Sequence, residues 1–188
     1  MKKSLVIVGV SALVLVGAFY ALNSFMYEEV PIYGAKDYKD VQYVVDRKVL
    51  RLGELGLAYF GNELHTDLDG DGRKDVAFLV THQPGGSGTF YYVVAALKTE
   101  RGYVGSEGLL LGDRIAPQTT ERSQNPVHKG VIIVNYAERA PGEPMTAQPS
   151  VGKSIWLKLN PQSIPVQWGE VAQNFEGESN LPQTPSTN

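Results

Sequence analysis

Residues 75–98, with the sequence DVAFLVTHQPGGSGTFYYVVAALK, contain the clearest structural pattern in the chain. Two runs rich in valine and aromatic residues, Val76–His82 and Thr89–Lys98, flank the short segment Pro84–Gly88. Glycines and a proline between two β-prone runs are typical of a hairpin loop. We therefore expect two adjacent antiparallel strands here, with a β-rich fold around them.

Further β-prone runs lie on both sides of this hairpin. Leu57–Leu64, Gly130–Ala137 and Ser154–Leu159 resemble it in composition, and glycine, proline or asparagine residues separate them. Val41–Leu52 is compatible with a short helix or a strand, although its valine and tyrosine content favours a strand. Beyond the N-terminal segment, no run has apolar residues at a sustained helical spacing. The sequence predicts a mostly β fold, a compact antiparallel sheet or sandwich domain, over residues 41–175.

Three polar stretches are expected to lie outside regular strands. Gln118–Lys129 is polar and is predicted to form a surface loop. Arg139–Pro149 contains three prolines, which are incompatible with a regular central strand. The tail Glu176–Asn188, with the sequence EGESNLPQTPSTN, is poor in apolar residues and is predicted to be disordered.

The N-terminal segment has a different character. Ser4–Tyr27 contains no charged residue and lies between two lysines and two glutamates. As a helix it would be about 36 Å long, enough to cross a hydrocarbon layer of ~30 Å. Lysines before the span and glutamates after it favour a cytoplasmic N-terminus and a C-terminal domain outside the membrane.

A cleaved signal peptide is the alternative for this segment. Cleavage favours small residues at positions −3 and −1, and the candidate pairs fail, for example Gly17 with Phe19. We therefore predict an uncleaved transmembrane anchor over residues 1–27. A juxtamembrane linker over 28–40, the extracytoplasmic β domain over 41–175 and the tail over 176–188 follow it.

Composition excludes several classes of site. The chain has 188 residues, a net charge of −3 and no cysteine. Without cysteine there are no disulfides, no cysteine–zinc sites and no thiol nucleophiles. An acidic balance argues against nucleic acid as a partner, because binding a phosphate backbone requires a basic face.

The sharpest chemical motif is DLDGDGRKD, residues 67–75. Its four carboxylates occupy positions 1, 3, 5 and 9 of a loop in which Gly72 permits a sharp bend. Ligation by several oxygens suits Ca²⁺ better than zinc or copper. The sequence therefore predicts a calcium site whose ligands are the side chains of Asp67, Asp69, Asp71 and Asp75 and the backbone carbonyl of Arg73.

The motif is not a complete EF-hand, and an alternative without metal exists. The position of the bidentate glutamate is occupied by Phe78, in a segment that resembles a strand. The alternative is a turn rich in aspartate and glycine, stabilised by hydrogen bonds from the aspartate side chains to the backbone. If calcium binds, a structural ion is favoured over a catalytic one.

Together with its neighbours, the loop resembles a known family. The segments Tyr59–Glu63, Gly85–Phe90, Leu111–Arg114 and Gly130–Val134 occur with the acidic loop in an order similar to that of a family of uncharacterised exported bacterial proteins. These carry an FG-GAP-like or EF-hand-like DxDGDGxxD loop followed by GGSGTF and LGDR. The resemblance covers about residues 43–159 and implies export but no established activity. Some relatives have cysteines that this chain lacks.

Two common catalytic motifs do not fit the sequence. The glycines around Ser87 are not followed by the Gly-Lys-Ser/Thr of a phosphate-binding loop, and neither Ser87 nor Ser106 lies in a Gly-x-Ser-x-Gly motif. The three histidines are dispersed. Asp113 and Arg114 are expected to form an ion pair that orients a strand end.

These observations lead to a functional hypothesis. We expect a membrane-anchored, extracytoplasmic, calcium-binding β domain that contacts another envelope or surface macromolecule as a non-catalytic binding or scaffolding module. The alternative is a calcium-stabilised envelope hydrolase. The alternative lacks a paired acid and base, or a nucleophile with its base, in the sequence.

Overall fold

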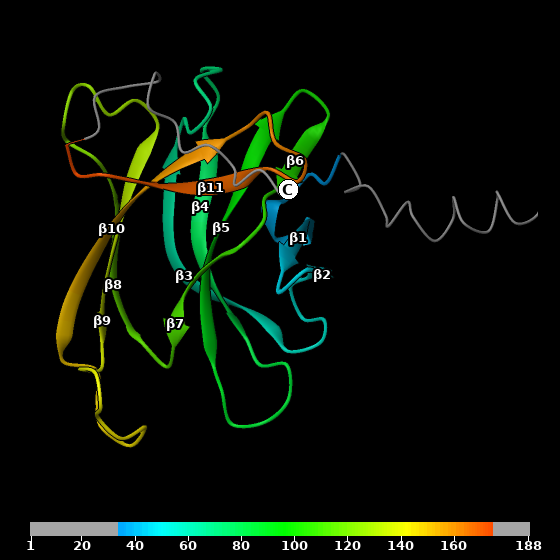
Figure 1. Cartoon of the computed structure of the whole chain (residues 1–188). Helices are drawn as coiled ribbons and strands as arrows, with labels where there is room; N and C mark the ends of the chain where they lie inside the picture. The colour runs from blue at the N-terminus through cyan, green and yellow to red at the C-terminus, as the bar shows by residue number, and fades with distance from the viewer. Residues whose placement is uncertain (1–33, 175–188) are drawn as a thin grey trace, which may run out of the picture. The chain divides into compact units, whose positions relative to one another are not determined.

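The computed structural model of the chain describes residues 34–174 (Figure 1). The predicted anchor over 1–27, residues 28–33 of the predicted linker and the predicted tail over 176–188 lie outside these residues. Within residues 34–174, no helix has the length and apolar character needed to cross a membrane.

Strands dominate the described part of the chain, and all paired strands run antiparallel. One short 3₁₀ turn, η1 (Tyr38–Asp40), precedes them. The strands are β1 (Gln42–Val45), β2 (Lys48–Arg51), β3 (Leu57–Thr66), β4 (Asp75–His82), β5 (Phe90–Thr99), β6 (Gly102–Gly105), β7 (Leu109–Asp113), β8 (Ala116–Arg122), β9 (Val131–Glu138), β10 (Val151–Asn160) and β11 (Gln167–Val171). The prediction of a mostly β, antiparallel fold is confirmed.

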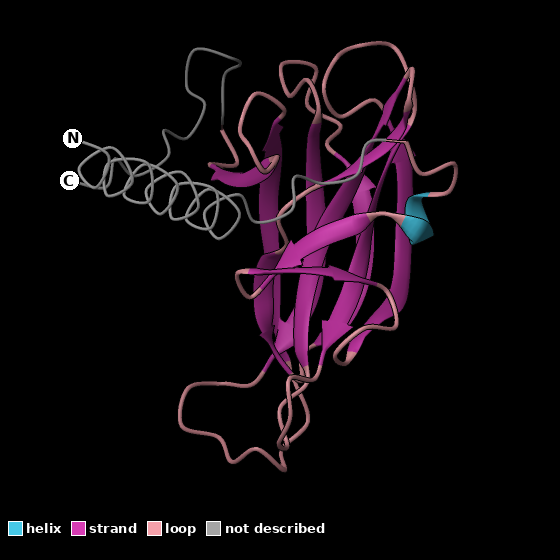
Figure 2. Ribbon diagram, turned by 90° about the vertical axis from the view of Figure 1, so that its right-hand side faces the viewer, coloured by secondary structure: helices cyan, strands magenta, loops and turns pink. Residues whose placement is uncertain are grey.

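Two sheets pack face to face. The first has the order β3-β4-β5-β6, with β7 also paired to β5, and the second has the order β11-β10-β9-β8 (Figures 1 and 2). Side chains from both sheets form one buried cluster, to which β4 contributes Ala77 and Leu79, β9 contributes Ile132, and β10 contributes Leu157. The described domain is therefore a β-sandwich.

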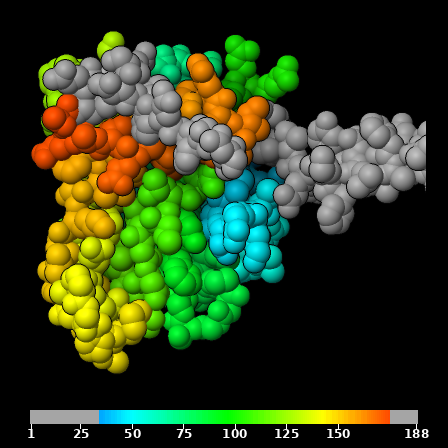
Figure 3. Space-filling model, in the orientation of Figure 1, coloured from blue at the N-terminus to red at the C-terminus, as the bar shows by residue number. Residues whose placement is uncertain are grey.

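A second buried cluster covers the other face of the first sheet. Val76, Phe78 and Val80 of β4 point away from the sandwich core and pack against Tyr43 and Val45 of the β1–β2 hairpin. Figure 3 shows this hairpin, in blue and cyan, lying against the green strands of the first sheet. Because β4 is buried on both faces, its sequence is almost continuously apolar rather than alternating.

The predicted hairpin over residues 75–98 is confirmed. β4 and β5 pair from Val76 opposite Ala96 to His82 opposite Phe90, and Pro84–Gly88 lies in the connecting loop. The proline-rich segment Arg139–Pro149 has no strand, as expected.

Two sequence predictions need correction. Val41–Leu52 forms two strands rather than one, joined by a two-residue turn in which Asp46 and Arg47 have φ angles of 51° and 61°. Positive φ at both positions suits the twist of a tight hairpin. The predicted loop Gln118–Lys129 contains most of β8, whose residues are polar because β8 is an edge strand with several exposed side chains.

β6 and β7 pair with successive halves of β5, and a short interruption separates them. The Ser106 hydroxyl accepts a hydrogen bond from the Ala95 amide (2.8 Å) in place of a ladder partner. The next amide, that of Glu107, donates to the Val166 carbonyl (2.7 Å) between β10 and β11, and the Val44 amide of β1 donates to the Ser106 carbonyl (3.2 Å). This segment therefore contacts both sheets and the hairpin.

Candidate metal centre

The acidic loop is the tip of the hairpin formed by β3 and β4. The two strands pair up to Thr66 opposite Asp75, and residues 67–74 connect them. Inside this loop Gly72 has a φ of +83°, a backbone conformation that glycine adopts readily. The bend predicted at Gly72 is therefore present.

Three carboxylates converge within the loop. Asp67, Asp69 and Asp71 each offer an oxygen, and these oxygens lie within 4.8 Å of one another. Oxygens bound to one Ca²⁺ at 2.3–2.6 Å can be up to about 5 Å apart, so this spacing suits a common cation. Burial raises the pKa of the Asp69 carboxyl, and the Asp71 and Asp67 carboxylates raise it further. Burial and the neighbouring carboxylates thus both disfavour the charged form of Asp69, and a bound cation would favour that form.

Each of the three carboxylates also accepts backbone hydrogen bonds within the loop. Asp67 accepts from the amides of Gly70 (2.7 Å) and Gly72 (3.0 Å). Asp69 accepts from the Asp71 amide (3.1 Å), and Asp71 accepts from the Arg73 amide (2.7 Å). These bonds are those expected for a turn without metal. They also hold the carboxylates close together, so the geometry is compatible with both interpretations of the sequence.

Arg73 reaches the centre through its side chain. Its guanidinium forms an ion pair with Asp71 Oδ2, and its Nε donates a hydrogen bond to the Lys98 carbonyl (2.8 Å). The loop therefore places a positive charge of its own beside one of the three carboxylates. A bound cation would compete with this guanidinium for Asp71.

Asp75 has a different role from the other three aspartates. Its carboxylate is fully buried, with Oδ2 accepting from the Leu68 amide (2.8 Å) and Oδ1 accepting from the Lys98 amide (2.7 Å). Burial raises the pKa of Asp75 to about 6, although the two amide hydrogen bonds act in the opposite direction. Asp75 thus braces the loop against β5, and the group of converging oxygens consists of the other three aspartates.

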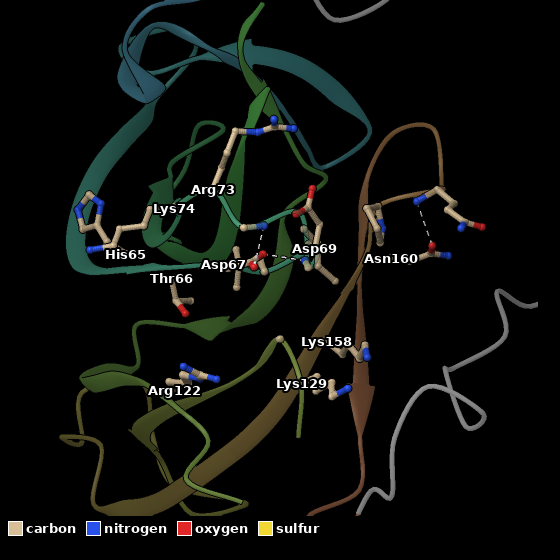
Figure 4. A pocket seen from close by; sticks show the side chains of 17 residues that line it. His65, Thr66, Asp67, Asp69, Arg73, Lys74, Arg122, Lys129, Lys158 and Asn160 are labelled. Carbon is tan, nitrogen blue, oxygen red and sulfur yellow. Dashed lines mark hydrogen bonds between the residues drawn. The ribbon is translucent and has the colours of Figure 1, made fainter. Parts of the chain in front are cut away.

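The loop also forms one wall of a pocket of about 850 Å³ (Figure 4). Facing it are Arg122 at the end of β8, Lys129 and Gly130 before β9, and residues 158–162 at the end of β10. Gly130 has a φ of +65°, and a Cβ there would lie 2.6 Å from the Leu68 carbonyl oxygen. The acidic loop and the β8–β9 loop therefore touch backbone to backbone. Sequence reasoning missed the basic residues because they come from distant segments.

A second polar cluster surrounds Glu63 on β3. The hydroxyls of Tyr38 and Tyr59 both donate to its carboxylate, and His65 Nε2 lies 3.2 Å from it. These hydrogen bonds, led by that from Tyr38, lower the pKa of Glu63 to about 2. His65 also lines the pocket, but its closest polar partner is Glu63 rather than an aspartate of the loop.

Two further pairs of polar side chains lie outside the acidic loop. Asp113 and Arg114 form the expected ion pair (3.0 Å), and Asp113 also accepts a hydrogen bond from the Thr89 amide (2.9 Å) at the start of β5. Ser123 Oγ and His128 Nδ1, which the sequence did not bring together, lie 2.7 Å apart. Both residues are buried, so this pair braces the β8–β9 loop rather than presenting a nucleophile.

Comparisons of the chain with protein-family models, with curated proteins and with solved structures found no match.

Proposed function

We propose that this chain is an exported, membrane-anchored β domain that binds one Ca²⁺ and acts as a non-catalytic binding module of the cell envelope. One observation carries the metal assignment: the oxygens of Asp67, Asp69 and Asp71 lie within 4.8 Å of one another at the tip of a braced hairpin. Asp75, which accepts hydrogen bonds from the Leu68 and Lys98 amides, would hold the ion-bound loop against β5.

The donor set fits calcium. Carboxylate oxygens are hard ligands, and Ca²⁺ accepts six to eight of them or their equivalents in flexible geometry. Asp67, Asp69 and Asp71 would hold the ion together with the Arg73 carbonyl, and water could supply further oxygens because Asp71 is exposed. Asp71 would exchange the Arg73 guanidinium for the ion, while the hydrogen bonds of Asp75 would remain in place.

Export and anchoring rest on the sequence. The charge-free segment Ser4–Tyr27, with lysines before it and glutamates after it, supports a single span with the C-terminal domain outside. The resemblance of the motif order to an exported bacterial family, inferred from the sequence, favours the same location.

A calcium-stabilised envelope hydrolase is the second candidate, because a pocket lies beside the acidic loop. The carboxylates that line this pocket are Asp67 and Asp69, and the proposal assigns both of them to the metal. Among residues 34–174, no further carboxylate lines the pocket to act as acid or base. We therefore keep the hydrolase as the second candidate.

Thermal unfolding of the full-length chain in detergent tests the calcium assignment. A ligand that binds only the folded state at about 100 times its Kd stabilises it by about 2.7 kcal/mol. At about 2–4 °C per kcal/mol, we expect Ca²⁺ to raise the Tm by about 5–11 °C relative to EDTA.

Two variants identify the site in this experiment. The Asp69→Asn variant should lose the calcium response, whereas Asp46→Asn, in the exposed turn between β1 and β2, should keep it. Identical melting curves in Ca²⁺ and EDTA would reject the proposal. An equal response to Mg²⁺ would reject calcium as the specific ion.

A further inference from the structure

The pocket beside the acidic loop is basic, although the protein as a whole is acidic. Its charged lining consists of two aspartates and five side chains of Lys or Arg, namely Arg73, Lys74, Arg122, Lys129 and Lys158. The net charge of the chain is −3. Positive charge is therefore concentrated at this hollow, where it would attract an anion.

Three of these cations have no partner of their own. In the part of the chain that the structure describes, the side chains of Lys74, Arg122 and Lys129 form no ion pair and no hydrogen bond, whereas Arg73 is paired with Asp71. Unpaired cations around a concave site are available to a ligand without breaking existing contacts.

Lys158, another cation of the pocket, is largely removed from solvent. Lys158 on β10 is 7% exposed and lines the same pocket. Its register partner on β9 is Val131, two residues after Lys129, so the two lysines come from the same end of neighbouring strands. Figure 4 shows Arg122, Lys129 and Lys158 on the side of the pocket away from Asp67 and Asp69.

We propose that this pocket binds a small phosphorylated molecule whose phosphate is held by Arg122, Lys129 and Lys158. A guanidinium can donate two parallel hydrogen bonds to a phosphate, and lysine ammonium groups add compact positive charges. A volume of about 850 Å³ accommodates a small organic molecule. The side chains of Asn160 and Gln162 line the same hollow and offer amide groups to its neutral part.

The shape of the site favours a small ligand over a lipid surface or a duplex. The cations surround a hollow between three separate segments, the β3–β4 loop, the β8–β9 loop and the end of β10. A flat membrane or a long polyanion would instead require cations spread over an exposed face.

This inference rests on the proposed role as a binding module, but it does not require the metal. Calcium at the acidic loop would neutralise Asp67 and Asp69, which face the phosphate across the pocket. Calcium and phosphate should therefore strengthen each other's binding, by about fivefold or more if the coupling is typical.

Isothermal titration of the full-length chain in detergent, with glycerol 3-phosphate as the probe and EDTA present, tests the inference. We expect saturable binding that glycerol does not reproduce. Removing two charge-assisted hydrogen-bond donors in the double variant Arg122→Gln/Lys129→Gln should weaken binding by about tenfold or more. Both residues are exposed, so the variant should retain the wild-type Tm, and Lys48→Gln on β2 is the matched control with unchanged affinity.

Several results would overturn the inference. They are the absence of saturable binding up to about 10 mM probe, equal binding by the double variant, and binding to phosphatidylglycerol vesicles without binding of glycerol 3-phosphate. The calcium melting experiment remains separate. Probe binding in EDTA without a calcium response would reject the metal proposal and support the phosphate site. A calcium response without probe binding would support the metal proposal and reject the phosphate site.

Discussion

The buried carboxylate of Asp75 allows a quantitative test of how the acidic loop is held. In the Asp75→Ala variant, the amides of Leu68 and Lys98 both lose their acceptor. An unsatisfied buried amide costs about 1–3 kcal/mol, so two cost about 2–6 kcal/mol. Removing a buried charge, whose burial raises the pKa of Asp75, offsets part of this loss. We expect a net destabilisation of about 2–4 kcal/mol.

The Asp75→Asn variant separates hydrogen bonding from volume. Its amide oxygen can accept from one of the two backbone amides, whereas its NH₂ group faces the other donor. We therefore expect a loss of about 1–3 kcal/mol, smaller than that of the alanine variant. Glu100→Ala, at an exposed position after β5, is the control and should change stability by less than about 0.5 kcal/mol.

Urea denaturation of the full-length chain in EDTA measures these differences, and thermal melting should give shifts of about 2–4 °C per kcal/mol. EDTA removes any contribution from a bound metal. If Asp75→Ala has the stability of wild type in EDTA, the bracing role is wrong. If the variant is weaker only in Ca²⁺, Asp75 is a metal ligand, as the sequence alone predicted.

Three further predictions concern other parts of the domain. The pKa of Glu63 is lowered from 4.5 to about 2, so its stabilising contribution is fully present above pH 4.5 and is lost as the pH falls towards 2. Denaturation at successive pH values should therefore show the stability difference between wild type and Glu63→Gln narrowing over that interval. Gly130→Ala should cost about 1–3 kcal/mol, because of its positive φ and the contact with the Leu68 carbonyl, and an unchanged urea midpoint would contradict this. Phe78→Ala should cost about 3–5 kcal/mol, whereas Phe60→Ala, at a side chain 42% exposed, should cost much less in the same assay.

The sequence was most informative where burial is most complete. β4 and β5 lie between the second sheet and the β1–β2 hairpin, so both of their faces are apolar and the pattern stands out from its surroundings. β8 escaped prediction for the opposite reason, because several of its side chains are exposed and polar. The turn at Asp46 and Arg47 escaped because neither residue is a glycine, although both have positive φ.

The sequence likewise indicated only some of the residues of the candidate site. The three converging aspartates are close in sequence, so their spacing alone indicated a shared centre. Burial of Asp75 depends on its position against β5, which local spacing does not reveal. Arg122, Lys129 and Lys158 meet only because β8, β9 and β10 are neighbours in the second sheet, and no spacing along the chain indicates this.

The interruption between β6 and β7 bears on how the domain opens. Through Ser106 and Glu107, one short segment is hydrogen-bonded to Ala95 in the first sheet, to Val44 in the hairpin and to Val166 in the β10–β11 turn. Detaching any one of these layers breaks a bond at the same place. Amide protons in all three layers should therefore exchange with deuterated solvent through one shared opening event, with similar protection factors rather than a graded series.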